Sequence, residues 1–209
     1  MIVRRLVVGP FEENSYVVGD EATKEGALID PGGDVDELLA LAENEGLRIG
    51  KILITHAHID HVTGAAEARR KTKALTHLHP ADRDMLASVP GQAAMFGLPP
   101  VEVPEIDVWV EEGQVVKVGG LAFKVLFVPG HAPGHVVYAE TQRAFVGDTI
   151  FAGSIGRTDF PGCSFDQLVS GIRGKIFMLG DAVLLHPGHG PDTTVSRERK
   201  TNPFAGEDA

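Results

Sequence analysis

The seven residues at 55–61, Thr-His-Ala-His-Ile-Asp-His, constrain most strongly what this chain can fold into. They place three imidazoles and one carboxylate within six consecutive positions, directly after the apolar segment 51–54. Side chains of these two kinds together bind divalent metals such as zinc, iron and manganese. In an extended segment His56 and His58 point to the same side, whereas Asp60 follows a change of direction at the start of a predicted helix. The stretch therefore predicts two metal ions side by side, each needing further ligands from elsewhere in the chain.

The first half of the chain reads as strands followed by helices. Its predicted strands are 2–8, 15–19, 27–29, 51–54 and 74–76, and its predicted helices are 34–42, 64–70 and one that starts at Pro80. Strand, helix and strand in succession form a βαβ unit, which predicts a partly parallel sheet. The segment 89–105 contains four prolines and two glycines, and we expect it to be the longest loop, a candidate lid or substrate rim.

The second half changes to hairpins. Strands are predicted at 115–118, 121–128, 136–139, 144–146 and 182–185, with a helix at 165–177 and a partly ordered polar tail after Ser196. Gly119-Gly120 is the turn signal of the first hairpin. Each half thus predicts a mixed sheet with helices, and two such halves packed sheet to sheet would form a four-layer αββα sandwich. We expect one domain over residues 1–209, because no linker separates the halves.

Three further strand ends carry metal-binding side chains after a glycine or proline turn. Val-Pro-Gly-His ends at His131, and Val-Gly-Asp ends at Asp148. The third, His-Pro-Gly-His, offers both His186 and His189. Because sites in α/β proteins form at the ends of strands, we expect these side chains to gather on one rim with the 55–61 stretch.

Composition excludes several classes of function and of site. The chain has 19 basic and 29 acidic residues, a net charge of −10, which is a poor match to a nucleic-acid backbone. Cys163 is the single cysteine, so an internal disulfide and a thiolate-rich zinc site are excluded; we expect it to be a small filler rather than a nucleophile. The apolar run after Arg5 is too short for a signal peptide, and no window is long enough to span a membrane. We expect a cytoplasmic protein.

Taken together, these motifs resemble the metallo-β-lactamase superfamily, and within it the glyoxalase II (hydroxyacylglutathione hydrolase) group in its compact bacterial form. The resemblance covers nearly the whole chain, and the matching pieces occur in family order. They are Thr-His-Ala-His-Ile-Asp-His at 55–61, Pro-Gly-His-Ala-Pro-Gly-His at 129–135, Gly-Asp-Thr-Ile-Phe at 147–151 and Pro-Gly-His-Gly-Pro at 187–191, with Glu-Asn-Ser-Tyr at 13–16 and Ile-Asp-Pro-Gly around Asp30. The resemblance implies the αββα fold.

The resemblance also implies a ligand set for two metal ions. The first site would take His56, His58 and His131. The second site would take Asp60, His61 and His189, and Asp148 would bridge both ions. The family places its last ligand between two glycines, which favours His189 over His186. Asp60 and Asp148 are the residues expected to be catalytic as well as metal-binding.

Other polar residues are expected to support the site or to be ordinary. His135 is expected to brace the ligands or to be structural. Asp30 is expected to cap its turn, with a contact to the metal histidines as a further role. Arg157 is expected to hold a salt bridge that braces its loop, and a substrate contact is the alternative. His77 and His79 show no partner pattern.

Two divalent ions, Zn first and Fe or Mn as alternatives, would determine the chemistry. Metals about 3.5–4 Å apart lower the pKa of a bridging water to about 7, so the hydroxide would be the nucleophile. They also polarise a carbonyl and stabilise the oxyanion. A thiol of pKa about 8.5 leaves without a general acid, which favours a thioester. The resemblance points to S-D-lactoylglutathione, hydrolysed to D-lactate and glutathione.

Larger glyoxalase II proteins continue into a helical domain that holds glutathione, whereas this chain ends about twenty residues after His189. The expected partner is therefore a small-molecule thioester that need not contain glutathione.

Two rival functions remain. A persulfide dioxygenase, similar around Gly-Arg-Thr-Asp-Phe at 156–160, would hold one iron with His56, His131 and Asp148. A non-catalytic metal-dependent binding module would lack ligands, and none is missing.

Overall fold

The computed structural model describes residues 1–209 and contains two large mixed sheets. The first sheet has the order β1-β2-β3-β4-β5-β6. Its strands are β1 (Ile2–Val8), β2 (Glu13–Gly19), β3 (Glu25–Ile29), β4 (Arg48–Leu53), β5 (Leu75–Leu78) and β6 (Val108–Trp109). Strands β1 to β3 pair antiparallel, and β3 to β6 pair parallel, as the predicted βαβ unit requires.

The second sheet has the order β14-β13-β10-β9-β8-β7. Its strands are β7 (Val115–Val118), β8 (Leu121–Phe127), β9 (Val136–Ala139), β10 (Arg143–Gly147), β13 (Leu184–Pro187) and β14 (Thr193–Thr194). Only β10 and β13 pair parallel. A small separate hairpin, β11 (Ile150–Phe151) with β12 (Ser154–Ile155), follows β10 directly.

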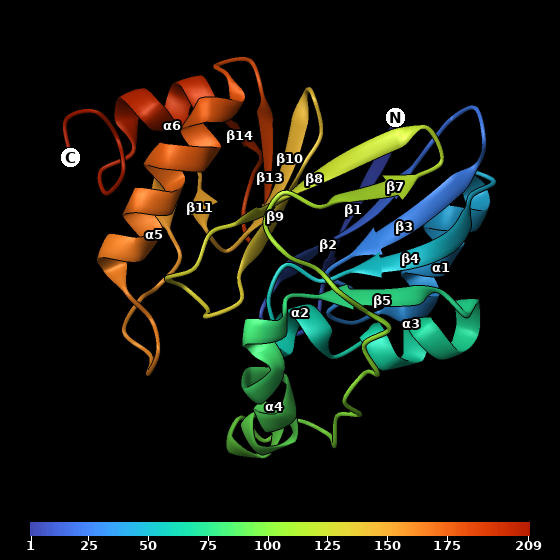
Figure 1. Cartoon of the computed structure of the whole chain (residues 1–209). Coiled ribbons are helices and arrows are strands. Elements are labelled where there is room, and N and C mark those ends of the chain that lie inside the picture. The colour runs from blue at the N-terminus through green and yellow to red at the C-terminus, as the bar shows by residue number, and fades with distance from the viewer.

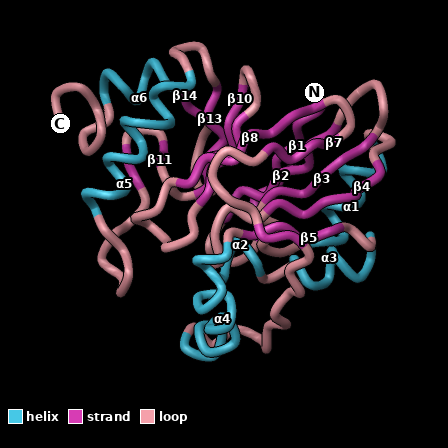
Figure 2. Tube along the Cα trace, viewed as in Figure 1, coloured by secondary structure: helices cyan, strands magenta, loops and turns pink.

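Helices cover the two outer faces of the paired sheets (Figures 1 and 2). The first half contributes α1 (Val35–Asn44), α2 (Ile59–Val62), α3 (Ala65–Thr72) and α4 (Arg83–Met95), and the second half contributes α5 (Phe165–Gly171) and α6 (Val195–Thr201). None of these helices has both the length and the apolar character that crossing a membrane would need.

Three apolar clusters show that the layers are stacked αββα. The central cluster joins the two sheets, with Tyr16 and Ile29 from the first against Phe123 and Phe145 from the second. One outer cluster packs α1 and α3 on the first sheet, and the other packs α5 and α6 on the second. The predicted four-layer sandwich is therefore confirmed.

Two predictions about loops were wrong. The segment 89–105 begins in helix, because α4 continues through Pro90 to Met95. Leu86, Val89 and Ala93 are buried at helical spacing, and their packing outweighs the hydrogen bond that proline cannot donate. Only the residues after Met95 form an extended connection to β6.

The polar tail is folded rather than partly ordered. It forms α6, in which Glu198 is fully buried and accepts a hydrogen bond from the Thr193 hydroxyl. Arg173 donates to the carbonyls of Ala205 and Gly206 and so fastens the last residues to the second half. The predicted helix 165–177 is also less regular than expected, because α5 changes into a π-helical turn at Ile172.

Candidate metal centre

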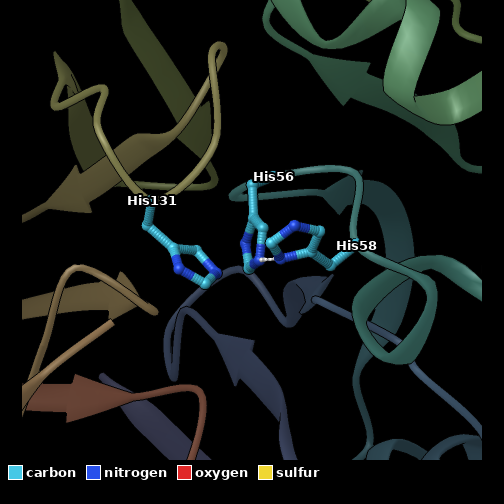
Figure 3. A group of neighbouring side chains, drawn as sticks. All are labelled: His56, His58 and His131. Atoms are coloured by element: carbon cyan, nitrogen blue, oxygen red, sulfur yellow. Dashed lines mark hydrogen bonds between the residues drawn. The ribbon is translucent and has the colours of Figure 1, made fainter. Parts of the chain in front are cut away.

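The imidazoles of His56, His58 and His131 converge, and we call them the three-histidine group (Figure 3). His56 and His58 lie in the loop after β4, and His131 lies in the loop between β8 and β9. Nε2 of His56 and Nδ1 of His58 are 2.9 Å apart. Nδ1 of His131 is 2.8 Å from the carbonyl oxygen of Arg157, to which it must donate, so its Nε2 carries the lone pair that faces the group.

A second set, which we call the mixed group, consists of Asp60, His61 and His189. Asp60 and His61 belong to the short helix α2, and His189 follows β13. Nε2 of His189 is 3.1 Å from Oδ2 of Asp60. Nδ1 of the fully buried His61 lies 3.1 Å from Oδ2 of Asp30, to which it donates, so Nε2 is its free nitrogen.

Asp148 lies between the two groups. It follows β10, where Gly147 adopts a left-handed conformation with φ of 48°. Its Oδ1 is 3.4 Å from Nε2 of His61, and its Oδ2 is 3.5 Å from Nε2 of His131 and 3.6 Å from Nε2 of His189. One carboxylate therefore reaches ligand candidates of both groups, which is the position that a bridging ligand needs.

Several atoms of this centre have no partner, which tests whether a metal fits. Nε2 of His61, Nε2 of His131 and Oδ1 of Asp148 are buried without any hydrogen bond. Buried polar atoms are rarely left unpaired, because each costs about 1–3 kcal/mol. All three belong to the set of donor atoms described above, and imidazole nitrogen with carboxylate oxygen is the donor set of zinc, iron and manganese sites. The residues present fit a pair of divalent ions.

The glycine at 188 keeps the centre compact. A Cβ atom at this position would overlap the Asp148 carboxylate and the His61 ring. The Pro-Gly-His turn can therefore pass directly over Asp148 only because residue 188 has no side chain.

Metal binding requires neutral imidazoles and ionised carboxylates, and the surroundings favour that state for His56, His58 and Asp148 but not for His61. Burial lowers the pKa of His56 well below its ordinary value and lowers that of His58 to about 3. Burial alone would raise the pKa of Asp148, but the neighbouring histidines, His61 first, outweigh it and lower that pKa. For His61, the carboxylates of Asp148 and Asp60 overcome the effect of burial and raise the pKa, so its surroundings favour a positive charge.

Asp30 contacts the centre directly instead of capping its own turn. Its Oδ1 accepts the Thr55 amide at 2.6 Å, and its Oδ2 accepts the Thr55 hydroxyl at 2.7 Å as well as Nδ1 of His61. The carboxylate fixes the orientation of the His61 ring. The expected turn-capping role was wrong, and the contact with a candidate ligand is the one that the structure contains.

The other histidines separate into two kinds. His135 stacks on His56 with ring centroids 4.6 Å apart, and its Nε2 accepts the Asp148 amide at 3.0 Å. His186 belongs to neither group, because it stacks on Phe145 and its Nδ1 is 3.1 Å from Asp192. His77 and His79 are likewise absent from every cluster of candidate ligands.

Arg157 is exposed and forms two hydrogen bonds of 2.7 Å with the Asp159 carboxylate. Its guanidinium also lies 4.1 Å from the ring centroid of Phe160, which packs near His58. Cys163 donates its thiol hydrogen to the carbonyl of His131 at 2.9 Å. These three contacts stabilise the loop that carries the Arg157 carbonyl and faces the three-histidine group.

Sequence reasoning missed two buried carboxylates. Oε1 of Glu13 is 3.8 Å from Nδ1 of His61, and burial raises the pKa of Glu13 well above its ordinary value. Asp82 accepts amide hydrogens from Ala57 and Gly134. Glu13 could have been suspected from the Glu-Asn-Ser-Tyr motif, whereas Asp82 stands two residues after Pro80 and looks like part of an ordinary helix start.

A cavity of about 370 Å³ borders Asp60. Phe11, Leu98 and Val101 line its apolar side, and Arg70 lies among its polar lining residues. Phe11 packs edge to face on Phe96, with ring centroids 5.3 Å apart. The turn between β1 and β2 and the connection after α4 therefore form the walls of a small-molecule-sized space beside the mixed group.

The model of the metallo-beta-lactamase superfamily matches residues 8–202 of the chain. Hydroxyacylglutathione hydrolase GloC from Haemophilus influenzae is 36% identical over 208 residues, which cover 98% of each chain. The crystal structure of BLEG-1 B3 metallo-beta-lactamase superposes with a TM-score of 0.90 at 33% identity, over 98% of this chain and 99% of that one. TTHA1623 in a di-iron-bound form superposes with a TM-score of 0.86 at 38% identity, over 97% and 100%.

Proposed function

The chain belongs to the metallo-β-lactamase superfamily, and we propose that it is a dinuclear metal-dependent hydrolase of small-molecule thioesters. The most specific form of the proposal is hydroxyacylglutathione hydrolase, which converts S-D-lactoylglutathione into D-lactate and glutathione. The similarity to GloC over the full chain supports it. Zinc is the proposed metal, and the di-iron form of TTHA1623 makes iron the first alternative, followed by manganese.

One observation carries the dinuclear proposal: Asp148 lies within 3.6 Å of candidate ligands from both groups. A centre for one ion would need only one of these groups. We propose that His56, His58 and His131 hold one ion, that Asp60, His61 and His189 hold the other, and that Asp148 contacts both.

When bound, two divalent ions supply a water molecule of lowered pKa and a positive charge that stabilises a developing oxyanion. The chain's own residues prepare this centre. Asp30 and the Arg157 carbonyl fix the tautomers of His61 and His131, so that each presents Nε2 to the centre. The ionised carboxylate of Asp148 brings negative charge into a buried setting, where charge interactions are strong.

The substrate is proposed to approach on the side of the mixed group. His189, a member of that group, has a side chain that is 30% exposed, and Asp60, another member, borders the cavity. The cavity beside Asp60 would hold one arm of the thioester, with its apolar part against Phe11. A thiol of pKa about 8.5 leaves as the thiolate without a proton donor, so the centre needs no separate general acid.

The alternative reaction, persulfide dioxygenation, would use one iron held by His56, His131 and Asp148. In that case Nε2 of the buried His61 would remain without a partner. The presence of a complete mixed group supports the hydrolase, and it also argues against a binding module that has lost ligands.

The proposal is tested on purified protein by two assays and a metal analysis. We expect two metal ions per chain, loss of the S-D-lactoylglutathione absorbance and no oxygen uptake with glutathione persulfide. Hydrolysis of other small thioesters instead would keep the reaction class and change the thiol. A single iron with oxygen uptake and no thioester hydrolysis would refute the proposal.

A further inference from the structure

Asp82 lies at the start of α4 and is completely buried. Its Oδ2 accepts the backbone amide of Ala57 at 2.8 Å, and its Oδ1 accepts the backbone amide of Gly134 at 2.5 Å. Ala57 stands between His56 and His58, and Gly134 follows His131 in the same turn. One carboxylate therefore connects the two loops that carry the three-histidine group.

Capping its own helix does not explain this residue. The Asp82 side chain makes no capping hydrogen bond to α4, although an aspartate at a helix start normally accepts an amide of the first turn. Both carboxylate oxygens instead accept hydrogen bonds from backbone amides outside the helix, which are 25 and 52 residues away along the chain. A buried carboxylate lowers the stability of the fold unless it is well paired, so the position of Asp82 needs an explanation other than helix capping.

The three-histidine group needs such a connection because its members come from different sheets. His56 and His58 follow β4 of the first sheet, whereas His131 follows β8 of the second. A backbone hydrogen bond of 2.9 Å from the Val136 amide to the Thr55 carbonyl joins the bases of the two loops. Asp82 joins them further along, next to the histidines themselves.

We propose that Asp82 is a positioning residue that sets the separation of these two loops and thereby the affinity of the three-histidine group for its metal ion. This inference rests on the proposed dinuclear centre. Residues that only orient ligands commonly change metal affinity by 10–100-fold when they are replaced. The ion held by the mixed group should depend less on Asp82, because His189 follows β13, and Asp60 and His61 belong to α2, which begins just beyond the loop that Asp82 holds.

Gly134 supports the same inference from the other side. A Cβ atom at this position would lie 2.6 Å from the Asp82 amide nitrogen and 2.7 Å from Cγ of its carboxyl group. These approaches are closer than real Cβ contacts, so a side chain here would push the second loop away from Asp82. Gly134→Ala therefore disturbs the same connection without changing the carboxylate.

The test compares Asp82→Asn with a matched control. The variant keeps the size of the side chain but presents an NH₂ group to one of two amide donors. Glu198→Gln is the control, because Glu198 is also a fully buried carboxylate and accepts the Gly153 amide at 2.9 Å, but lies in α6 and contacts no candidate ligand. Burial raises the pKa of Asp82 to about 6, so measurements at pH 8 keep it ionised.

Each protein is loaded with two zinc ions and titrated with a coloured zinc chelator, and thermal stability is recorded in parallel. We expect Asp82→Asn to weaken one ion by about 10–100-fold and to change the other by less than about threefold. Glu198→Gln should lower thermal stability and leave both affinities unchanged. Cobalt-loaded Asp82→Asn should show an altered absorption spectrum for one of its two ions.

Gly134→Ala should reproduce the selective loss, and it decides the question if Asp82→Asn does not fold. Unchanged affinities in the folded variants, or an equal loss of both ions, would mean that Asp82 has only a structural role. If the wild-type protein binds fewer than two ions, the proposed function fails before this inference is reached, so the two failures are distinguishable.

Discussion

His186 and His189 lie three residues apart, yet their surroundings differ completely. His189 contacts Asp60 and Asp148, whereas His186 is enclosed by Phe145 and Asp192. Residue type and spacing do not show which of the two histidines is the candidate ligand. The strand register does, because Phe145 of β10 lies directly opposite His186 of β13, whereas His189 lies beyond the strand end.

The two histidines give a matched pair of variants. His189→Ala should reduce the metal content from two ions to one and lower kcat/KM by at least the 10–100-fold that is typical of residues which only support a ligand. His186→Ala should keep both ions, because it removes no group that faces the centre. Metal analysis by mass spectrometry under native conditions measures both, and loss of an ion from His186→Ala would show that the assignment is reversed.

Arg157 is proposed to brace its loop through Asp159 rather than to bind substrate. If so, Arg157→Ala, Asp159→Asn and the double variant should show the same change in KM, because each removes the same pair. Steady-state kinetics of the three proteins tests this. A rise in KM that appears only when Arg157 is absent would instead indicate a substrate contact.

At the scale of elements, α4 and the connection after it form one wall of the proposed substrate cavity. The residues after Met95 run back along α3, where Arg69 holds Asp107 through hydrogen bonds of 2.8 and 3.0 Å. Asp107 also accepts the Thr76 amide of β5 at 2.9 Å. The wall is thus fastened at its far end by a carboxylate that bonds to both a helix and a strand.

The fastening should weaken in acid. The hydrogen bonds from Arg69 lower the pKa of Asp107 to about 2, below the value of about 3.9 expected in the unfolded chain. A lowered native pKa stabilises the fold above the unfolded pKa, and this contribution is lost as the pH falls through the native one. Asp107→Asn should therefore be less stable than wild type at pH 6, and the difference should shrink below about pH 4. Urea unfolding of metal-free protein across this range measures it; a difference independent of pH would contradict the assignment.

Phe11 tests the cavity from the opposite wall. Phe11→Ala removes its contact with Phe96 and opens the apolar side of the space beside Asp60. We expect KM for the thioester to rise about 10-fold or more with a smaller change in kcat, since in the proposed site the ring would contact substrate and transition state alike. Unchanged KM would place the substrate outside this cavity.

At the scale of the whole molecule, sequence patterns predicted what depends on neighbouring residues and missed what depends on distant ones. Local sequence was enough to recognise the strand-end turns at His131 and Asp148 and the His-x-His-x-Asp-His stretch. The family resemblance that these motifs carry then implied the αββα fold. Asp82 could not be recognised, because its partners are backbone amides that any residue could supply. The helix around Glu198 was missed because its segment consists largely of polar residues. Glu198 can be buried only because the folded chain brings two donors to its carboxylate, the Thr193 hydroxyl and the Gly153 amide.

The central claim is that two metal ions share Asp148, and counting ions tests it most directly. Mass spectrometry under native conditions of the metal-loaded wild type should show two ions per chain, and Asp148→Ala should lose both, because each group would then lack its shared ligand. Two ions retained in Asp148→Ala, or one ion in the wild type, would contradict the account.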